Sequence, residues 1–254
     1  MFEEGAHATK DVVDWMGRDI FVASEVTEMT PGGEYDRVRT DDPRLVRITA
    51  QRRCAKGIWE QVESLYPTIA DATDAGNLRR FIDMNPEPGT SVVLRDTSLV
   101  GEKSNNCVQL GGSWQNEYTA SEALELAHNL VTSASKSISV AIITPYRAQV
   151  KLLKRWIKDR RADDDTFDHI DVGTVHQFQG SDADIVIFDM VDGRGRPHIG
   201  KLLTGKNGIR LVNVAMTRAK GKLIVFANKR WYLRQESYEH SNPLIHRILT
   251  AELS

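Results

Sequence analysis

The sequence predicts an α/β fold in which a mostly parallel β-sheet is flanked by helices. Two observations lead to this prediction. Short runs rich in isoleucine and valine, typical of strands buried on both faces, alternate in the second half of the chain with amphipathic helical stretches. The 254 residues are 41% hydrophobic and 27% charged, a globular composition with enough apolar side chains for a sizeable core.

The strands are expected where β-branched residues cluster without a break. Five such segments are residues 91–95, 138–144, 169–175, 185–190 and 222–227. Helices are expected between them, at residues 53–65, 120–134 and 208–220 and directly after Thr144. Thr119 and Glu122 have the spacing of a capping box, and Thr144 followed by Pro145 has the pattern of an N-cap and a first-turn proline.

Three segments rich in glycine, proline and charged residues are expected to be loops: residues 28–44, 85–89 and 97–116. In an open parallel sheet, ligands bind at the loops that follow the carboxyl ends of the strands. Candidate functional residues are therefore sought in the segments that come after strands.

Charge is strongly segregated, although the formal net charge is only −2. Residues 163–184 contain seven aspartates and no lysine or arginine, whereas residues 193–235 contain eleven lysines and arginines and no acid. A charge run is commonly a solvated face, but a basic span of this length also suits phosphate binding. The two cysteines and seven scattered histidines offer no metal cluster, and no apolar run is long enough for a membrane span, so we expect a soluble cytoplasmic protein.

Several segments next to the expected strands share a recognisable order. They are ITPYRAQ at residues 143–149, VGTVHQFQGSDADIVIFDMV at 172–191 and RLVNVAMTRAKGKLIVFAN at 210–228, with weaker matches at 47–67 and 113–123. Together they resemble the motifs of the second RecA-like motor domain of superfamily 1 helicases, in the 5′-to-3′ branch that includes the nonsense-mediated-decay helicases. The resemblance covers roughly residues 45–228 and implies a RecA-like, P-loop NTPase fold.

The resemblance implies a nucleotide site at which Arg53 and Arg218 are catalytic. An arginine suits this role because its guanidinium stays charged and presents a planar set of donors to a phosphate. Arg52 stands where the family prefers an aromatic residue, so Arg52 and Arg53 are both candidates, and Arg218 has a surface ion pair as its alternative. The remaining nucleotide-binding candidates are Gln51, Gln179, Gly180 and Asp182. For the last three, the alternative to a nucleotide contact is a plain polar turn between two strands.

The resemblance also implies contacts to the backbone of a single strand of nucleic acid. The residues in these positions are Thr144, Pro145, Tyr146, Thr174 and His176. Hydroxyl groups and helix N-termini suit phosphate contacts that carry no sequence information. For Thr144, helix capping is a sufficient alternative role. His176 has no partner at metal-ligand spacing, so a metal site there is rejected.

A Walker A loop and a Walker B acid are not found in the sequence. Gly200, Gly205 and Lys206 fit part of the Walker A pattern, but Asn207 replaces its Ser or Thr and no buried strand precedes the segment, so it is interpreted as a coincidence. We expect a lead-in segment at 1–44 left from the junction with a missing first motor domain, a second RecA-like domain at 45–235 and a helical tail at 236–254.

The expected function follows from these segments. The chain would supply arginine fingers and contacts to single-stranded DNA or RNA, while ATP with Mg²⁺ would be shared with a Walker A-bearing domain or subunit and held only weakly by this chain alone. The chain is therefore expected to be inactive as an ATPase by itself, and no membrane partner is expected. Two alternatives stay open: a non-catalytic interaction module that retains the fold, and an inactive gene fragment.

Overall fold

The computed structural model of the chain describes residues 27–29, 35–36, 42–46, 48–101, 105–235 and 242–251. The chain divides into two compact units, residues 1–49 and 50–254. In the first unit, β1 (Glu28–Met29) pairs antiparallel with β2 (Tyr35–Asp36), so the stretch predicted as a loop holds a short hairpin. Most of the predicted lead-in segment lies outside the described residues, and the predicted domain boundaries stay predictions.

The second unit is built on a five-stranded sheet in the order β5–β11–β10–β8–β9, and every neighbouring pair is parallel. The strands are β5 (Val92–Asp96), β8 (Val140–Thr144), β9 (Ile170–Thr174), β10 (Ala183–Asp189) and β11 (Ala219–Ala227). All five lie where the apolar runs predicted strands. The central strands are buried on both faces, as the unbroken apolar runs require.

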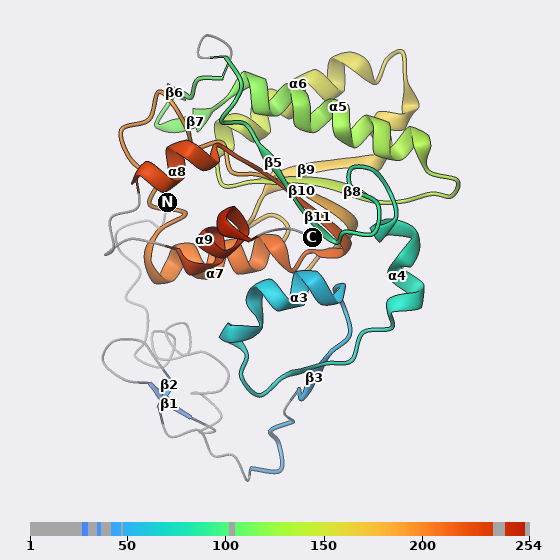
Figure 1. The fold of residues 1–254 in the computed structure, drawn as a ribbon, viewed down its shortest axis with the longest axis vertical. Helices are drawn as coiled ribbons and strands as arrows, with labels where there is room; N and C mark the ends of the chain where they lie inside the picture. Colours follow the sequence, from blue (N-terminus) through green and yellow to red (C-terminus); the bar gives the residue numbers. More distant parts are fainter. Residues whose placement is uncertain are drawn as a thin grey trace, which may run out of the picture. The chain divides into compact units, whose positions relative to one another are not determined.

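Helices cover both faces of this sheet (Figure 1). One layer contains α5 (Glu117–Ser133) and α6 (Arg147–Arg160), which contact β8 and β9. The opposite layer contains α3 (Lys56–Val62) and α7 (Gly205–Met216), and α9 (Pro243–Thr250) packs on both of them. This arrangement confirms the predicted RecA-like α/β fold.

Shorter elements complete the unit. They are β3 (Ala50–Gln51) paired parallel with β4 (Ala70–Asp71), the antiparallel hairpin of β6 (Val108–Leu110) and β7 (Ser113–Gln115), α4 (Ala75–Ile82), α8 (Lys229–Gln235) and the 3₁₀ turns Glu63–Leu65 and Asp165–His169. The β6–β7 hairpin lies within the segment predicted as a loop. Its turn residues Gly111 and Gly112 have φ values of +54° and +76°, which favour glycine.

Helix ends differ from the sequence prediction in three places. The N-cap of α5 is Asn116, whose side chain accepts from the backbone N–H groups of Tyr118 and Thr119, so the predicted Thr119 capping box is wrong. Helix α6 begins at Arg147 with Tyr146 as its N-cap residue, since Thr144 completes β8. Helix α7 ends at Met216, four residues before the predicted end.

The described part of the C-terminal segment contains α9. Asn242 caps α9 by accepting from the N–H of Leu244 at 3.1 Å. Leu244, Ile245, Ile248 and Leu249 are buried in the same core cluster as the sheet. Residues 236–241 and 252–254 lie outside the described residues. No helix in the described ranges is long and apolar enough to cross a bilayer.

Candidate functional site

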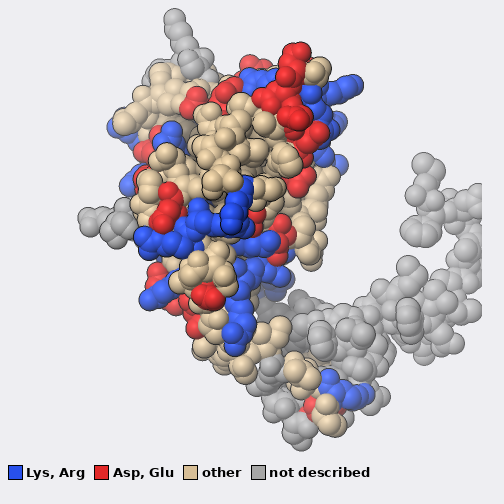
Figure 2. Space-filling model, turned by 90° about the vertical axis from the view of Figure 1, so that its right-hand side faces the viewer, with Lys and Arg blue, Asp and Glu red and all other residues tan. Residues whose placement is uncertain are grey.

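A cluster of charged side chains lies at the amino ends of β10 and β11. Asp182 immediately precedes β10, and Arg218 lies in the short turn between α7 and β11. Arg53 comes from the segment that leads into α3. Figure 2 looks onto this side of the molecule and shows lysine and arginine side chains gathered across it. This cluster therefore lies at the opposite end of the sheet from the carboxyl ends, where ligands were expected.

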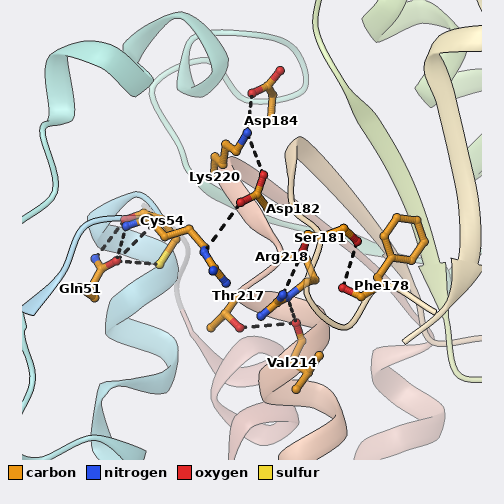
Figure 3. A network of polar contacts seen from close by, with 11 residues as sticks. Gln51, Cys54, Phe178, Ser181, Asp182, Asp184, Val214, Thr217, Arg218 and Lys220 are labelled. Carbon is orange, nitrogen blue, oxygen red and sulfur yellow. Dashed lines mark hydrogen bonds and ion pairs between the residues drawn. The ribbon is translucent and has the colours of Figure 1, made fainter. Parts of the chain in front are cut away.

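Arg218 is held by backbone carbonyls (Figure 3). Its Nη1 donates to the carbonyl oxygen of Ser181 at 2.9 Å, and its Nε donates to that of Val214 at 3.2 Å. Partial burial, and next the nearby charge of Arg53, lower the pKa of Arg218, while Asp182 opposes this shift. Within the described residues Arg218 forms no ion pair, so a bound anion would stabilise its charge.

Asp182 is the carboxylate that links the cluster. Its Oδ1 lies 2.8 Å from Nζ of Lys220, and its Oδ2 lies 3.9 Å from Nε of Arg53. The hydrogen bond to Asp182 raises the pKa of Lys220. The Nζ atom of Lys220 also lies 3.8 Å from Oδ1 of Asp184. Arg53, Arg218 and Lys220 face two carboxylates, so the cluster has a formal surplus of one positive charge.

Gln51 organises the backbone that presents Arg53. Its Oε1 accepts from the N–H groups of Arg53 at 3.0 Å and Cys54 at 3.2 Å. Its Nε2 donates to the carbonyl of Cys54 at 3.1 Å and to the hydroxyl of Thr73 at 2.7 Å. The amide is thus fully engaged within the protein, and a direct nucleotide contact by Gln51 stays a prediction. Of the two candidate arginines, Arg53 is the one within ion-pair distance of Asp182.

Gln179 and Gly180 lie in the turns between β9 and β10, and both are exposed. Gly180 has a φ of +93°, a conformation that side-chain-bearing residues rarely adopt. The segment crosses from the carboxyl end of β9 to the amino end of β10, because these two strands are parallel and are joined by only eight residues. It therefore connects the carboxyl ends of the strands with the charged cluster.

Most of the residues predicted to contact nucleic acid are buried in this structure. Thr144 is fully buried, and its hydroxyl accepts from the N–H of Tyr146 at 3.4 Å. Pro145 and Tyr146 are also buried, and Thr174 is 9% exposed. His176 is exposed, so it is the candidate side chain at this end of the sheet that faces solvent.

A buried polar network lies beneath these residues, and sequence reasoning missed it. Gln149, on the inner side of α6, donates from Nε2 to Asp189 at 2.6 Å and to the carbonyl of Asn116 at 3.0 Å, and its Oε1 accepts from the N–H of Asn116 at 2.8 Å. The hydroxyl of Thr119 donates to the same Asp189 oxygen at 3.1 Å. The network joins the starts of α5 and α6 to the end of β10. The signal for this network in the sequence is Asp189, an acidic residue at the end of an otherwise apolar strand.

Because Asp189 is a buried carboxyl group, we expect the free energy of unfolding to depend on pH. Burial raises its pKa from 3.8 to about 6, although three hydrogen-bond donors oppose the shift. A carboxyl with a raised pKa in the folded state holds its proton more tightly there, so its contribution to stability is present below about pH 4 and is lost as the pH rises through about 6. We expect the difference in unfolding free energy between the wild type and Asp189→Asn to fall by up to about 3 kcal/mol over this range. Urea unfolding at a series of pH values measures it, and a difference that grows with pH would contradict the assignment.

A buried ion pair supports Tyr146. Nη1 of Arg196 lies 2.9 Å from Oδ1 of the fully buried Asp192 and donates to the Tyr146 hydroxyl at 2.8 Å. The guanidinium also lies over the rings of Trp114 and Tyr146, 4.4 Å and 5.2 Å from their centroids. The other carboxylate oxygen of Asp192 accepts from the N–H of Gly200 at 2.6 Å. These contacts fix the loop after β10 against the start of α6 and the β6–β7 hairpin.

The partial Walker A pattern does not form a phosphate-binding loop here. Gly200 packs against Tyr146 and Asp192, and Gly205 is the first residue of α7. The preceding strand, β10, ends at Asp189, so no strand leads directly into the segment.

Comparisons with known proteins agree with the helicase motifs. A family model described as an AAA domain matches residues 42–230. The DNA replication ATP-dependent helicase/nuclease JHS1 of Arabidopsis thaliana is 28% identical over 77% of this chain and 15% of its own length. A regulator of nonsense transcripts 1 homolog of Drosophila melanogaster is 28% identical over 56% of this chain and 12% of its own length.

A third relative is an uncharacterised ATP-dependent helicase of Methanocaldococcus jannaschii, which is 31% identical over 53% of this chain and 20% of its own length. The chain thus matches a fifth or less of the length of each of these relatives. The family match, the order of the motifs and the parallel sheet lead to one assignment. The chain belongs to this family of AAA domains and is a C-terminal RecA-like domain of the superfamily 1 helicase type.

Proposed function

We propose that this chain supplies the cationic half of a composite ATP site in a nucleic-acid-dependent motor. Arg218 and Arg53 act on the phosphates of an ATP–Mg²⁺ complex whose P-loop belongs to another domain, either in the same protein or in a partner. Asp182, Gly180 and Gln179 border the nucleotide on this side. The observation that carries the proposal is the convergence of two arginines, from segments 165 residues apart, at one face with a surplus positive charge.

The geometry suits the chemistry of phosphoryl transfer. Negative charge spreads over the equatorial oxygens of the transferring phosphoryl group, and a guanidinium placed there in advance stabilises it. Gln51 and the carbonyls of Ser181 and Val214 hold the two arginines in place before any nucleotide arrives. The β9–β10 connection then links this site to the carboxyl ends of the strands, where we place single-stranded DNA or RNA.

A reconstitution experiment tests the proposal. ATP hydrolysis is measured for this chain alone, for a P-loop-bearing RecA-like domain alone and for their mixture, each with and without a single-stranded oligonucleotide. We expect negligible hydrolysis by this chain alone and stimulated hydrolysis by the mixture with the oligonucleotide. Hydrolysis by this chain alone, at the rate of the mixture, would show that the site is not composite. A mixture that is never stimulated would favour the non-catalytic interaction module.

A further inference from the structure

A cleft of about 1150 Å³ lies between the β6–β7 hairpin, the first half of α6 and the loop after β10. Pro145 and Tyr146, two of the candidate nucleic-acid residues, line one part of it. The charged residues of its lining are five cations and one acid: Arg147, Lys151, Arg155, Arg196, Lys201 and Glu117. Asp192 neutralises Arg196, and within the described residues the other four cations form no ion pair. The cleft therefore suits an anionic ligand.

Three of these cations form a row along α6. Arg147, Lys151 and Arg155 are four residues apart and exposed, so they lie on one face of the helix. At a rise of about 1.5 Å per residue, neighbouring cations are about 6 Å apart along the helix axis, and the row spans about 12 Å. This interval is of the order of the separation of successive phosphates in an extended single strand. A row of point charges at that interval matches a polyphosphate backbone better than a single phosphate.

Exposed apolar side chains form part of the remaining wall, beside the polar residues Ser113 and Gln115. Leu110 and Leu202 are 50% and 40% exposed, and both line the cleft beside Trp114. Every base has a π-face, so an unpaired base of any sequence can bury apolar area against these leucines. A Cβ built at Gly111 or Gly112 would meet no atom within 4 Å, so a bulky ligand can approach the hairpin tip.

We propose that this cleft is a second contact segment for single-stranded nucleic acid. The strand that passes the carboxyl ends of the sheet continues into the cleft, where Arg147, Lys151 and Arg155 contact successive phosphates and the bases pack against Leu110 and Leu202. The proposal rests on the proposed function, since it extends the same strand. Arg196 is a positioning residue here, because its ion pair with Asp192 holds the wall of the cleft against the hairpin.

The test compares two variants of the full chain that lose the same charge. Arg147→Ala/Lys151→Ala/Arg155→Ala removes the row in the cleft. Lys136→Ala/Lys154→Ala/Lys158→Ala removes three exposed lysines that do not line the cleft. Binding of fluorescein-labelled oligodeoxyuridylate and oligouridylate of fifteen nucleotides is measured by anisotropy over a range of salt concentrations. Circular dichroism checks that both variants are folded.

We expect the cleft variant to bind about tenfold or more weakly at low salt, with a slope of log K against log salt that is shallower by about 2, because three phosphate contacts on a single strand each contribute about 0.7. The control variant should keep a slope close to that of the wild type. If the cleft variant binds both oligonucleotides more weakly, the contacts are to phosphates. If it binds only one of them more weakly, that oligonucleotide identifies the sugar that the cleft accepts.

Equal binding and equal slopes in the two variants would overturn the proposal. In that case oligonucleotide binding by the wild type would leave the proposed function standing, since the contact would lie elsewhere on the chain. A cleft variant that keeps oligonucleotide binding but loses binding of a labelled polyglutamate peptide would also overturn it, because the cleft would then be a site for acidic protein. Absence of oligonucleotide binding by the wild type would count against the nucleic-acid part of the proposed function itself.

Discussion

Under the proposed function, replacing Arg218 with alanine should abolish ATP hydrolysis by the mixture of this chain and a P-loop-bearing domain. We expect kcat to fall by about 10³- to 10⁵-fold, the range over which an arginine that stabilises a transferring phosphoryl group contributes in related systems. ATP binding by the complex should weaken far less, because the charge that the arginine stabilises develops in the transition state. Steady-state hydrolysis with saturating single-stranded oligonucleotide measures kcat and KM separately.

Arg210→Ala is the matched control for this experiment. Arg210 is an exposed residue of α7 in the same basic span, so its replacement removes the same charge from the same helix region. It should leave kcat within about twofold of the wild type. Arg218→Lys keeps the charge but loses the planar set of donors, so it should restore only a small part of the rate. Wild-type hydrolysis by Arg218→Ala would rule out a catalytic role for this residue.

Replacing Gln149 with leucine should destabilise the second unit more than any surface change. The substitution leaves the buried N–H of Asn116 without a partner, and it removes one of the two side-chain donors to Oδ2 of Asp189. A buried polar group left unpaired costs about 1 to 3 kcal/mol and a lost hydrogen bond to a charged group about 1.5 to 3 kcal/mol, so we expect a total loss of about 3 to 5 kcal/mol. The measurement is urea unfolding followed by tryptophan fluorescence.

Gln109→Leu is the control for Gln149→Leu, because Gln109 is exposed on the short strand β6. It should change the unfolding free energy by no more than about 0.5 kcal/mol. Equal effects of the two substitutions would show that the network around Asp189 contributes little to stability.

The strands of the sheet were predictable because their signal is local. Val140–Ile143 and Ile185–Phe188 are unbroken apolar runs, and a parallel strand buried on both faces needs such a run whatever its neighbours are. Helix ends were less predictable because several polar residues compete for each cap. Thr119 has the spacing of a capping box with Glu122, but its hydroxyl donates to the buried Asp189, and Asn116 caps α5 instead.

The identity of Arg53, Asp182 and Arg218 as candidates followed from motif resemblance, but their placement did not. Asp182 and Arg218 precede their strands, so the cluster lies at the amino ends of the sheet. The burial of Tyr146 was also invisible in the motif, since it depends on the Arg196–Asp192 pair and on Trp114 of the hairpin, which pack around its ring.

Local sequence pattern is sufficient to establish the order of strands and helices along the chain, the class of fold and the family. These depend on the spacing of apolar residues and on short motifs. Packing over long sequence separations is what establishes the charged cluster, the network of Gln149 and Asp189 and the basic cleft. Arg53 and Arg218 meet only when α3 and β11 lie side by side, as the bond from the N–H of Ala55 to the carbonyl of Lys220 shows. Coulomb energies and desolvation depend on such distances between groups, and a linear sequence does not contain them.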